Sequence, residues 1–320
     1  MSLGLAVGMA VQLILVAGLA PMLVGVTRQT RARMEGRAGA GWAQPYRDLR
    51  KLLRKQPLRP HGTTIVFTAA PVVVAASTLA AACLVPIVVA STETGRVGDL
   101  FVVVGLLLLG SVTLTLAGLD GGTAFGGMGA SRTMTIAALV EPSLLLAVFA
   151  LSVPVHSTGL AAIVASVAAH PASVARPGAV LAGAALVIAA LAETGRLPVD
   201  NPATHLELTM VHEAMTLEYA GPQLAVLEWA SGLRLAVLLA LLVNLFWPAG
   251  LAIHTLTVPA LVLATVAIAV KVTVLAAVLA GAEVFLAKLR LFRVPELLAG
   301  AFLLGLLAVT ASSVLSVTAG

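Results

Sequence analysis

The chain has 320 residues, of which 60% are hydrophobic and 10% are charged, and its mean hydropathy is +1.06. A soluble domain carries about 25% charged residues, so this composition excludes a water-soluble globular protein. The formal net charge is +5, but most of the basic residues fall in one loop, which favours membrane topology over nucleic-acid binding. We predict an all-α, polytopic membrane protein in contact with the lipid bilayer and with no nucleic-acid partner.

The single cysteine, Cys83, lies inside an apolar run. One thiol forms no intrachain disulfide and cannot by itself ligate an iron–sulfur cluster or a structural zinc ion. We therefore expect no metal site in this chain and place any electron-carrying centre in another subunit.

A membrane-spanning helix needs about 20 apolar residues. Such runs occur near residues 3–26, 63–90, 100–119, 133–153, 177–193, 224–247, 256–286 and 296–318. The first run lacks the pattern of a cleaved signal peptide, so we expect it to remain in the mature protein. The apolar stretch 159–170 has only a dozen residues and is expected at the membrane interface. The sequence thus predicts about eight transmembrane helices in a single domain, residues 1–320.

Loop charges give the predicted orientation. Loops 27–62, 119–132, 194–223 and 287–295 carry 15 Lys and Arg residues, whereas the alternate loops carry two, Arg96 and Arg176. Because basic loops stay on the cytoplasmic side, we expect these four loops to be cytoplasmic and both termini to be non-cytoplasmic.

The first predicted cytoplasmic loop is basic and amphipathic. Its apolar residues Leu49, Leu52 and Leu53 recur at helical spacing between basic residues. Helices of this kind lie along a membrane surface with the apolar face down. On the residues alone, this loop is a topology anchor that holds anionic lipid.

The fifth loop is acidic, although it lies on the predicted basic side. Between residues 193 and 221 it has one basic residue, Arg196, and five acids: Glu193, Asp200, Glu207, Glu213 and Glu218. Acidic residues contribute little to membrane orientation, so these five are free to serve another purpose. A helix is expected to begin near Thr204, after the turn residues Asn201-Pro202.

Three interpretations of this loop remain open. The first is a metal site made by His205, Glu207, His212 and Glu213, but the H-E-x-x-H spacing is absent. The second is a solvated acidic loop without a specific role. The third is a proton-accepting cluster at the membrane edge, because neighbouring carboxylates raise each other's pKa toward neutral pH.

Ionisable residues also fall within the predicted spans, where they are costly and are functional candidates. They are Glu141, Glu228, Arg234, Lys271 and Glu283. Lys271 lies in the middle of its run, so we expect it to have a buried acidic or polar partner. Glu283 lies near a helix end, where a charged side chain reaches toward water, so we expect it to snorkel.

Two segments resemble a known family. The first loop contains R-x-R-x-E-x-R (Arg31 to Arg37) and G-W-x-Q-P-Y-R-D-L-x-K-L-L (Gly41 to Leu53). The fifth loop contains E-T-x-R-x-P-x-D-x-P (Glu193 to Pro202) and E-Y-x-G (Glu218 to Gly221). Both resemble the quinone-site membrane subunit of complex I, the subunit 1 family. They resemble more closely the membrane subunits of group 4 nickel–iron hydrogenases, of the hydrogenase-4 component C and formate hydrogenlyase subunit 4 type.

The resemblance implies two sets of site residues and no catalytic residue. The set implied for docking a peripheral redox module comprises Arg33, Glu35, Arg37, Gln44, Asp48, Lys51, Arg132, Arg196 and Asp200. The set implied for a proton pathway comprises Glu141, Glu193, Glu207, Glu213, Glu218, Glu228 and Lys271. Some positions depart from the complex I branch, since Val199, Ala203 and His205 stand where that branch has a phenylalanine and two glutamates.

The function implied is that of a non-redox membrane subunit of an energy-converting hydrogenase or formate hydrogenlyase-like complex, without catalysis of its own. Its implied partners are a hydrogenase-like large subunit with a nickel–iron centre, a small subunit with iron–sulfur clusters, and antiporter-like membrane subunits. The implied location is the prokaryotic cytoplasmic (inner) membrane. The alternatives are the quinone-site subunit of respiratory complex I, with quinone bound, and a stand-alone transporter, which the lack of an internal repeat disfavours.

Overall fold

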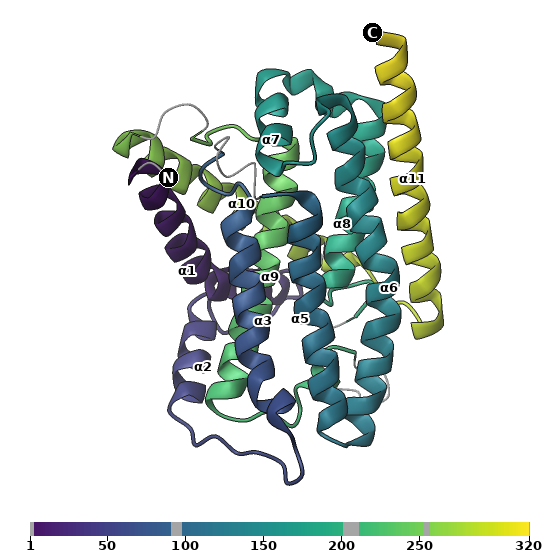
Figure 1. Cartoon of the computed structure of the whole chain (residues 1–320). Coiled ribbons are helices and arrows are strands. Elements are labelled where there is room, and N and C mark those ends of the chain that lie inside the picture. Colours follow the sequence, from purple (N-terminus) through teal and green to yellow (C-terminus); the bar gives the residue numbers. More distant parts are fainter. Residues whose placement is uncertain (1–2, 91–97, 201–210, 253–256, 320) are drawn as a thin grey trace.

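The computed structural model describes residues 3–90, 98–200, 211–252 and 257–319, and within them the chain is helical without a named strand (Figure 1). The helices are α1 Leu3–Met34, α2 Gln44–Leu53, α3 Ile65–Leu84, α5 Leu100–Asp120, α6 Ala124–Ser152, α7 Leu160–Ala169, α8 Pro177–Glu193, α9 Pro222–Phe246, α10 Val258–Phe285 and α11 Val294–Ala319. Short 3₁₀ turns cover Val153–Val155, Pro171–Ala175, Glu213–Met215 and Leu291–Arg293.

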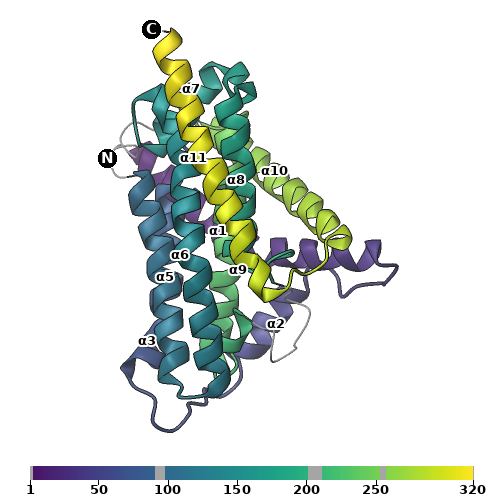
Figure 2. The same ribbon diagram turned by 90° about the vertical axis from the view of Figure 1, so that its right-hand side faces the viewer.

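The predicted all-α, polytopic membrane fold is confirmed. Seven of the described helices are long and apolar enough to cross a membrane: α1, α3, α5, α6, α9, α10 and α11. The remaining predicted span, residues 177–193, coincides with α8, which is apolar but has only 17 residues. The start of α1 and the end of α11 lie toward the end of the bundle opposite the loop that joins α2 to α3 (Figures 1 and 2). The cytoplasmic assignment of that loop stays a prediction.

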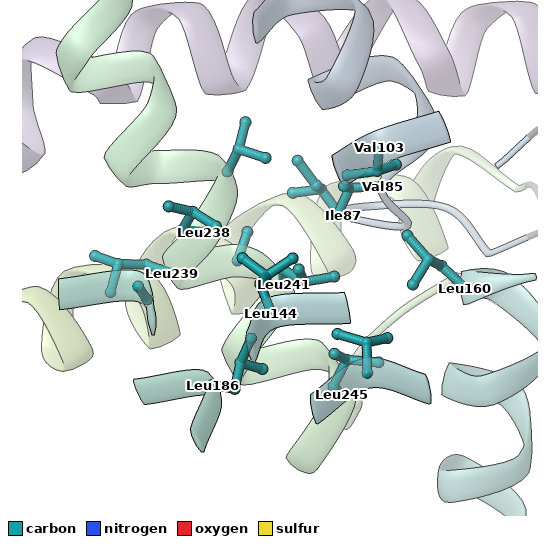
Figure 3. Close-up of a cluster of buried hydrophobic side chains, with 14 of the residues drawn as sticks. Val85, Ile87, Val103, Leu144, Leu160, Leu186, Leu238, Leu239, Leu241 and Leu245 are labelled. Atoms are coloured by element: carbon teal, nitrogen blue, oxygen red, sulfur yellow. The ribbon is translucent and has the colours of Figure 1, made fainter. Parts of the chain in front are cut away.

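Helix α9 is the centre of the bundle. It contacts α1, α2, α3, α7, α8 and α10. In the most apolar 18-residue stretch of each helix, 67% of the residues are buried in α9, against 28% in α10 and 22% in α11. Figure 3 shows Leu238, Leu239, Leu241 and Leu245 of α9 packed among leucines of neighbouring helices. Because polar groups on α9 face protein on most sides, this helix is suited to hold buried charges.

The outer helices expose apolar side chains. Helix α10 leans away from the upright helices (Figure 2), and α11 lies along α6 and α8. A row of exposed valines at every fourth position runs along α10, comprising Val258, Val262, Val266, Val270, Val274 and Val278. Such surfaces suit lipid, which is as apolar as these side chains.

The short apolar segment 159–170 forms α7, and its side chains Leu160 and Ile163 are fully buried. Residues 119–132, which are rich in glycine, were predicted to form a loop. In the structure only the first part is a turn, because α6 begins at Ala124. Thr123 caps this helix by accepting from the Gly126 amide, at 3.2 Å. A Cβ on Gly126 would lie 2.4 Å from the Gly118 carbonyl oxygen, so glycine permits α5 and α6 to approach closely.

An extended, buried segment follows α3. The helix ends before Pro86, which cannot donate a backbone hydrogen bond, and residues 85–90 that follow it are buried. Four backbone groups bond the side chain of Gln12 in α1: the carbonyls of Ala82 (2.7 Å) and Val85 (2.9 Å) and the amides of Ile87 (3.3 Å) and Val88 (3.0 Å). Non-helical backbone at membrane depth persists only where such partners exist, so Gln12 sustains this segment.

Lys271 stabilises the same region from α10. The Asn244 amide donates to the carbonyls of Pro86 and Ile87, at 2.9 and 3.1 Å. Lys271 Nζ donates to Asn244 Oδ1 at 3.2 Å and to two carbonyls past the end of α9, those of Trp247 (2.9 Å) and Ala249 (3.0 Å). A cation is favourable at a helix C-terminus. The expected polar partner of Lys271 is thereby confirmed.

Candidate functional site

The turn that ends α8 sets the position of two site residues. Gly195 adopts a left-handed φ of +58°. Its amide donates to the Ala192 carbonyl at 3.1 Å, and the Arg196 amide donates to the Leu191 carbonyl at 2.9 Å. This pair of bonds is a Schellman motif, which favours glycine because left-handed backbone strains other residues. The segment Glu193-Thr194-Gly195-Arg196 therefore leaves the helix with both charged side chains buried.

Arg196 connects this turn to α10 and α1. Its guanidinium lies 2.8 Å from Glu283 Oε1 and donates to Thr27 Oγ1 at 3.2 Å. Glu283 is only 3% exposed, so the predicted snorkelling of Glu283 is wrong. The physical reason is that Arg196 supplies a buried counter-charge and hydrogen bond, without which a buried carboxylate would be strongly unfavourable.

Asp200 makes a second connection, to the segment after α10. Its carboxylate accepts from Lys288 Nζ at 2.6 Å and from the Val211 amide at 3.3 Å. The Leu289 amide donates to the Pro198 carbonyl at 2.9 Å. Arg196 and Asp200, both predicted to dock a partner, are thus engaged in ion pairs within this chain. Their part in docking stays a prediction.

Arg234 of α9 lies against Glu193 inside the bundle. Its Nη2 is 2.5 Å from Glu193 Oε1, and the same nitrogen donates to Ser111 Oγ at 2.9 Å and to the Leu107 carbonyl. The contact with Glu193 is an ion pair without the alignment of a hydrogen bond, so Glu193 Oε1 and Arg234 Nε remain without hydrogen-bond partners in the described chain. Buried polar atoms without a hydrogen-bond partner are rare in folded proteins.

Glu141 of α6 belongs to the same buried group. It is 6% exposed, and its Oε1 lacks a hydrogen-bond partner among the described residues. It lies within electrostatic reach of both Glu193 and Arg234. Two of the seven predicted proton-pathway residues, on two different helices, are therefore brought together with one arginine. Sequence spacing could not show this, since Glu141 and Glu193 are 52 residues apart.

A small cavity of about 30 Å³ adjoins this group. Its polar lining comprises Ser111, Thr133, Glu193, Asp200, His212 and Arg234. Thr133 Oγ1 is another buried atom without a partner in the described chain. Ser111 and Thr133 were not identified from the sequence as site residues. A hydroxyl group in a membrane span commonly bonds a carbonyl of its own helix, so its presence in the sequence does not indicate a site.

A much larger cavity of about 920 Å³ opens between α1, α2 and α9. Its charged lining comprises Arg28, Arg31, Arg37, Asp48, Arg196, Glu213, Glu228, Arg234 and Glu283. Apolar residues, among them Trp229 and Leu235, complete the wall. The cavity therefore joins the predicted docking loop to the buried charges.

Pro21 shapes the wall of this cavity. Proline has no amide hydrogen and leaves the carbonyl of Ala17, four residues earlier, without its helical partner. Trp229 Nε1 of α9 donates to that carbonyl at 3.1 Å, and the Tyr46 hydroxyl of α2 donates to the next one, Gly18, at 2.5 Å. Burial raises the pKa of Tyr46, which keeps the phenol protonated as a donor.

The predicted docking loop is held in place by α1. Gln29 Oε1 accepts from the Gly41 amide at 2.7 Å, and Gln29 Nε2 donates to the Ala38 carbonyl at 3.0 Å. Within the predicted docking set, Arg33, Glu35, Arg37 and Lys51 are exposed, and Gln44 donates to Asp48 at 2.9 Å. Arg132 is half-buried on α6. The exposed members form a surface available to a partner, whereas their role is a prediction.

The remaining acids lie nearer the surface. Glu213 and Glu218 are half-buried, and Glu228 is exposed toward the large cavity. Glu207, together with His205 and the helix start predicted near Thr204, lies outside the described residues. Tyr219 stacks on Phe67 with ring centroids 4.0 Å apart and donates to its carbonyl at 2.8 Å. This contact anchors the E-Y-x-G segment to α3.

Lys271 lies apart from these acids. It bonds Asn244, which is ten residues beyond Arg234 on α9, a separation of roughly 15 Å along a helix. The structure thus gives Lys271 a fixed set of carbonyl partners, and its place in a proton pathway stays a prediction.

Comparison with known proteins identifies the family. Residues 7–313 match the family described as NADH dehydrogenase. The chain belongs to this family. Among its relatives, formate hydrogenlyase subunit 4 of Escherichia coli (strain K12) is 34% identical over 287 residues, covering 90% of this chain and 92% of the relative. Hydrogenase-4 component C of the same organism is 36% identical over 239 residues, covering 75% of this chain and 74% of the relative.

The NADH dehydrogenase family fold also appears in a solved structure. A chain in the membrane-bound sulfane sulfur reductase, an archaeal respiratory membrane complex, superposes with a TM-score of 0.81 at 18% identity. The match covers 97% of this chain and 100% of that chain. The resemblance inferred from the loop motifs is therefore confirmed at the level of family and fold.

Proposed function

We propose that this chain is the integral-membrane, non-redox subunit of an energy-converting hydrogenase or formate hydrogenlyase-like complex. It docks a peripheral redox module and couples that module to proton translocation. The names and coverage of the two bacterial relatives support the type of complex. The observation that carries the coupling role is the buried group of Glu141, Glu193 and Arg234 beside the large cavity.

The physical basis of coupling is the low dielectric inside the bundle. A charge that appears near a buried carboxylate changes its proton affinity far more than it would in water. The exposed residues of the first loop offer a docking surface next to the large cavity, and the Arg196–Glu283 and Lys288–Asp200 pairs connect the fifth loop to α10 and the segment after it. A redox event at the docked module therefore has a charged path to Glu193.

The proposed partners follow from this role. They are a hydrogenase-like large subunit with a nickel–iron centre, a small subunit with iron–sulfur clusters, and antiporter-like membrane subunits, all in a prokaryotic cytoplasmic membrane. The proposed proton pathway comprises Glu141, Glu193, Glu207, Glu213, Glu218 and Glu228. Lys271 is left out of the proposed pathway, because its bonds to Asn244 and to two carbonyls past the end of α9 favour a structural role.

The test uses the intact complex reconstituted in proteoliposomes. Glu193→Gln and Glu141→Gln should abolish proton translocation, measured with a pH-sensitive dye, while the subunits still co-purify. Glu296→Gln is the matched control, because Glu296 is exposed at the start of α11, and it should translocate protons normally. Unchanged translocation in both buried variants would discard the proposal.

The large cavity favours one second candidate, the quinone-site subunit of a respiratory complex. A cavity of about 920 Å³ with a mainly apolar wall and a few charged groups suits an amphiphilic ligand. Reduction of a short-chain quinone by the purified complex would support this candidate, and turnover with protons alone as electron acceptor would favour the hydrogenase type. Proteoliposomes that contain only this chain should be inactive, which separates both from a transporter.

A further inference from the structure

His212 lies between the two cavities. It lines the small cavity together with Glu193, and it also lines the large cavity beside Glu213. Among the described residues, only one other side chain, that of Arg234, lines both. Two contacts fix the position of His212. The amide of the preceding residue, Val211, donates to the Asp200 carboxylate. Gly195 packs against His212, since a Cβ built on Gly195 would lie 3.8 Å from His212 Cβ.

Burial and the positive charge of Arg234 keep the ring of His212 neutral, against the acidic groups around it. Arg234 faces it from α9, Asp200 and Glu193 from the end of α8 and the turn that follows, and Glu213 is its neighbour in the chain. Burial, together with the positive charge of Arg234, lowers the pKa of His212 to about 4, although Asp200 acts in the opposite direction. At neutral pH the ring then has one N–H donor and one acceptor nitrogen, the form that can take a proton at one nitrogen and release one from the other.

The small cavity is built to hold water. Its volume of about 30 Å³ exceeds the roughly 10–15 Å³ that one water molecule needs. Three atoms on its lining residues lack hydrogen-bond partners within the described chain: Thr133 Oγ1, Glu193 Oε1 and Arg234 Nε. A buried water requires two to four polar partners, and these atoms, on three different helices, provide them.

We infer that His212 is a proton-relay residue, which passes protons from the large cavity, through water held in the small cavity, to the carboxylate of Glu193. A hydronium ion in the large cavity gives its proton to one ring nitrogen and is left as water. The other ring nitrogen releases its proton to the water in the small cavity, and that water protonates Glu193. One proton moves in all and no electron is transferred. His212 is then neutral with its N–H on the other nitrogen, and rotation of the ring restores the starting arrangement. This inference rests on the proposed function.

The test measures the rate of proton translocation in the reconstituted complex. Glutamine is similar in size to histidine but has no ring that can relay a proton. His212→Gln should therefore slow translocation by at least about tenfold, which is less than the roughly 10²–10⁴-fold that a general acid–base group contributes to a rate. His212→Ala should be equally slow, and added imidazole should restore at least about half of the rate, since its ring carries the same chemistry. A purely structural role for His212 would not respond to imidazole.

The Glu193→Gln variant distinguishes failure of the His212 relay from failure of the proposed function. If Glu193→Gln is inactive while His212→Gln translocates at the native rate, or if His212→Ala is slow but imidazole has no effect, the relay through His212 is overturned and the proposed function stands. If Glu193→Gln and Glu141→Gln also translocate normally, the proposed function itself fails.

Discussion

Replacing Gln12 with methionine should destabilise the protein far more than replacing an exposed residue of α1. The Gln12 side chain makes four hydrogen bonds to buried backbone between Ala82 and Val88. Each backbone group left without a partner costs about 1–3 kcal/mol. At the lower bound, four groups give a loss of about 4 kcal/mol, comparable to much of the 5–15 kcal/mol that stabilises a typical domain.

The matched control is Ile14→Met, since Ile14 lies two residues further along α1 and is 74% exposed. Unfolding of the purified chain in detergent, titrated with sodium dodecyl sulfate and followed by circular dichroism, measures the free energy of each variant. Hydrogen exchange should also accelerate at the amides of Ile87 and Val88 in Gln12→Met alone. Free energies of the two variants within about 1 kcal/mol of each other would refute the reasoning.

Three further outcomes are expected. Arg196→Met should cost about 3–5 kcal/mol because it leaves Glu283 buried without a counter-charge, and adding Glu283→Leu should recover most of that loss; a double variant as unstable as the single one would contradict this account. Lys271→Met should lower Tm while leaving protons translocated per electron unchanged, whereas a native Tm with lost translocation would place Lys271 in the pathway. Because the pKa of His212 is lowered to about 4 in the folded protein, the unfolded chain binds more protons than the folded one between about pH 4 and the ordinary pKa of 6.5. Tm should therefore rise with pH across that window. Melting curves recorded over this pH range should show a shallower rise for His212→Gln.

Hydropathy alone predicted most of the fold. The run 177–193 coincides with α8, although it is shorter than a usual span, because Pro177 can begin a helix and Gly195 ends one. The loop predicted at 119–132 was too long, since α6 begins at Ala124 and Gly126 permits α5 and α6 to pack closely.

Partners of the buried charges could not be predicted in the same way. No partner for Arg234 could be named from the sequence, and in the structure it lies against Glu193 of α8. Glu283 was expected to reach water and instead bonds Arg196, 87 residues earlier. Periodicity states which residues share a helix face, but pairing across helices depends on how the helices cross.

The amino-acid sequence by itself determined that this chain is a polytopic membrane protein and which family it resembles. Each of these follows from local quantities: the length of apolar runs, the distribution of basic residues, and short motifs. Only the tertiary structure decided that Glu141, Glu193 and Arg234 form one buried group and that His212 stands between two cavities. The reason is that a charge in a low-dielectric interior is governed by its nearest neighbours in space, and those neighbours lie on different helices.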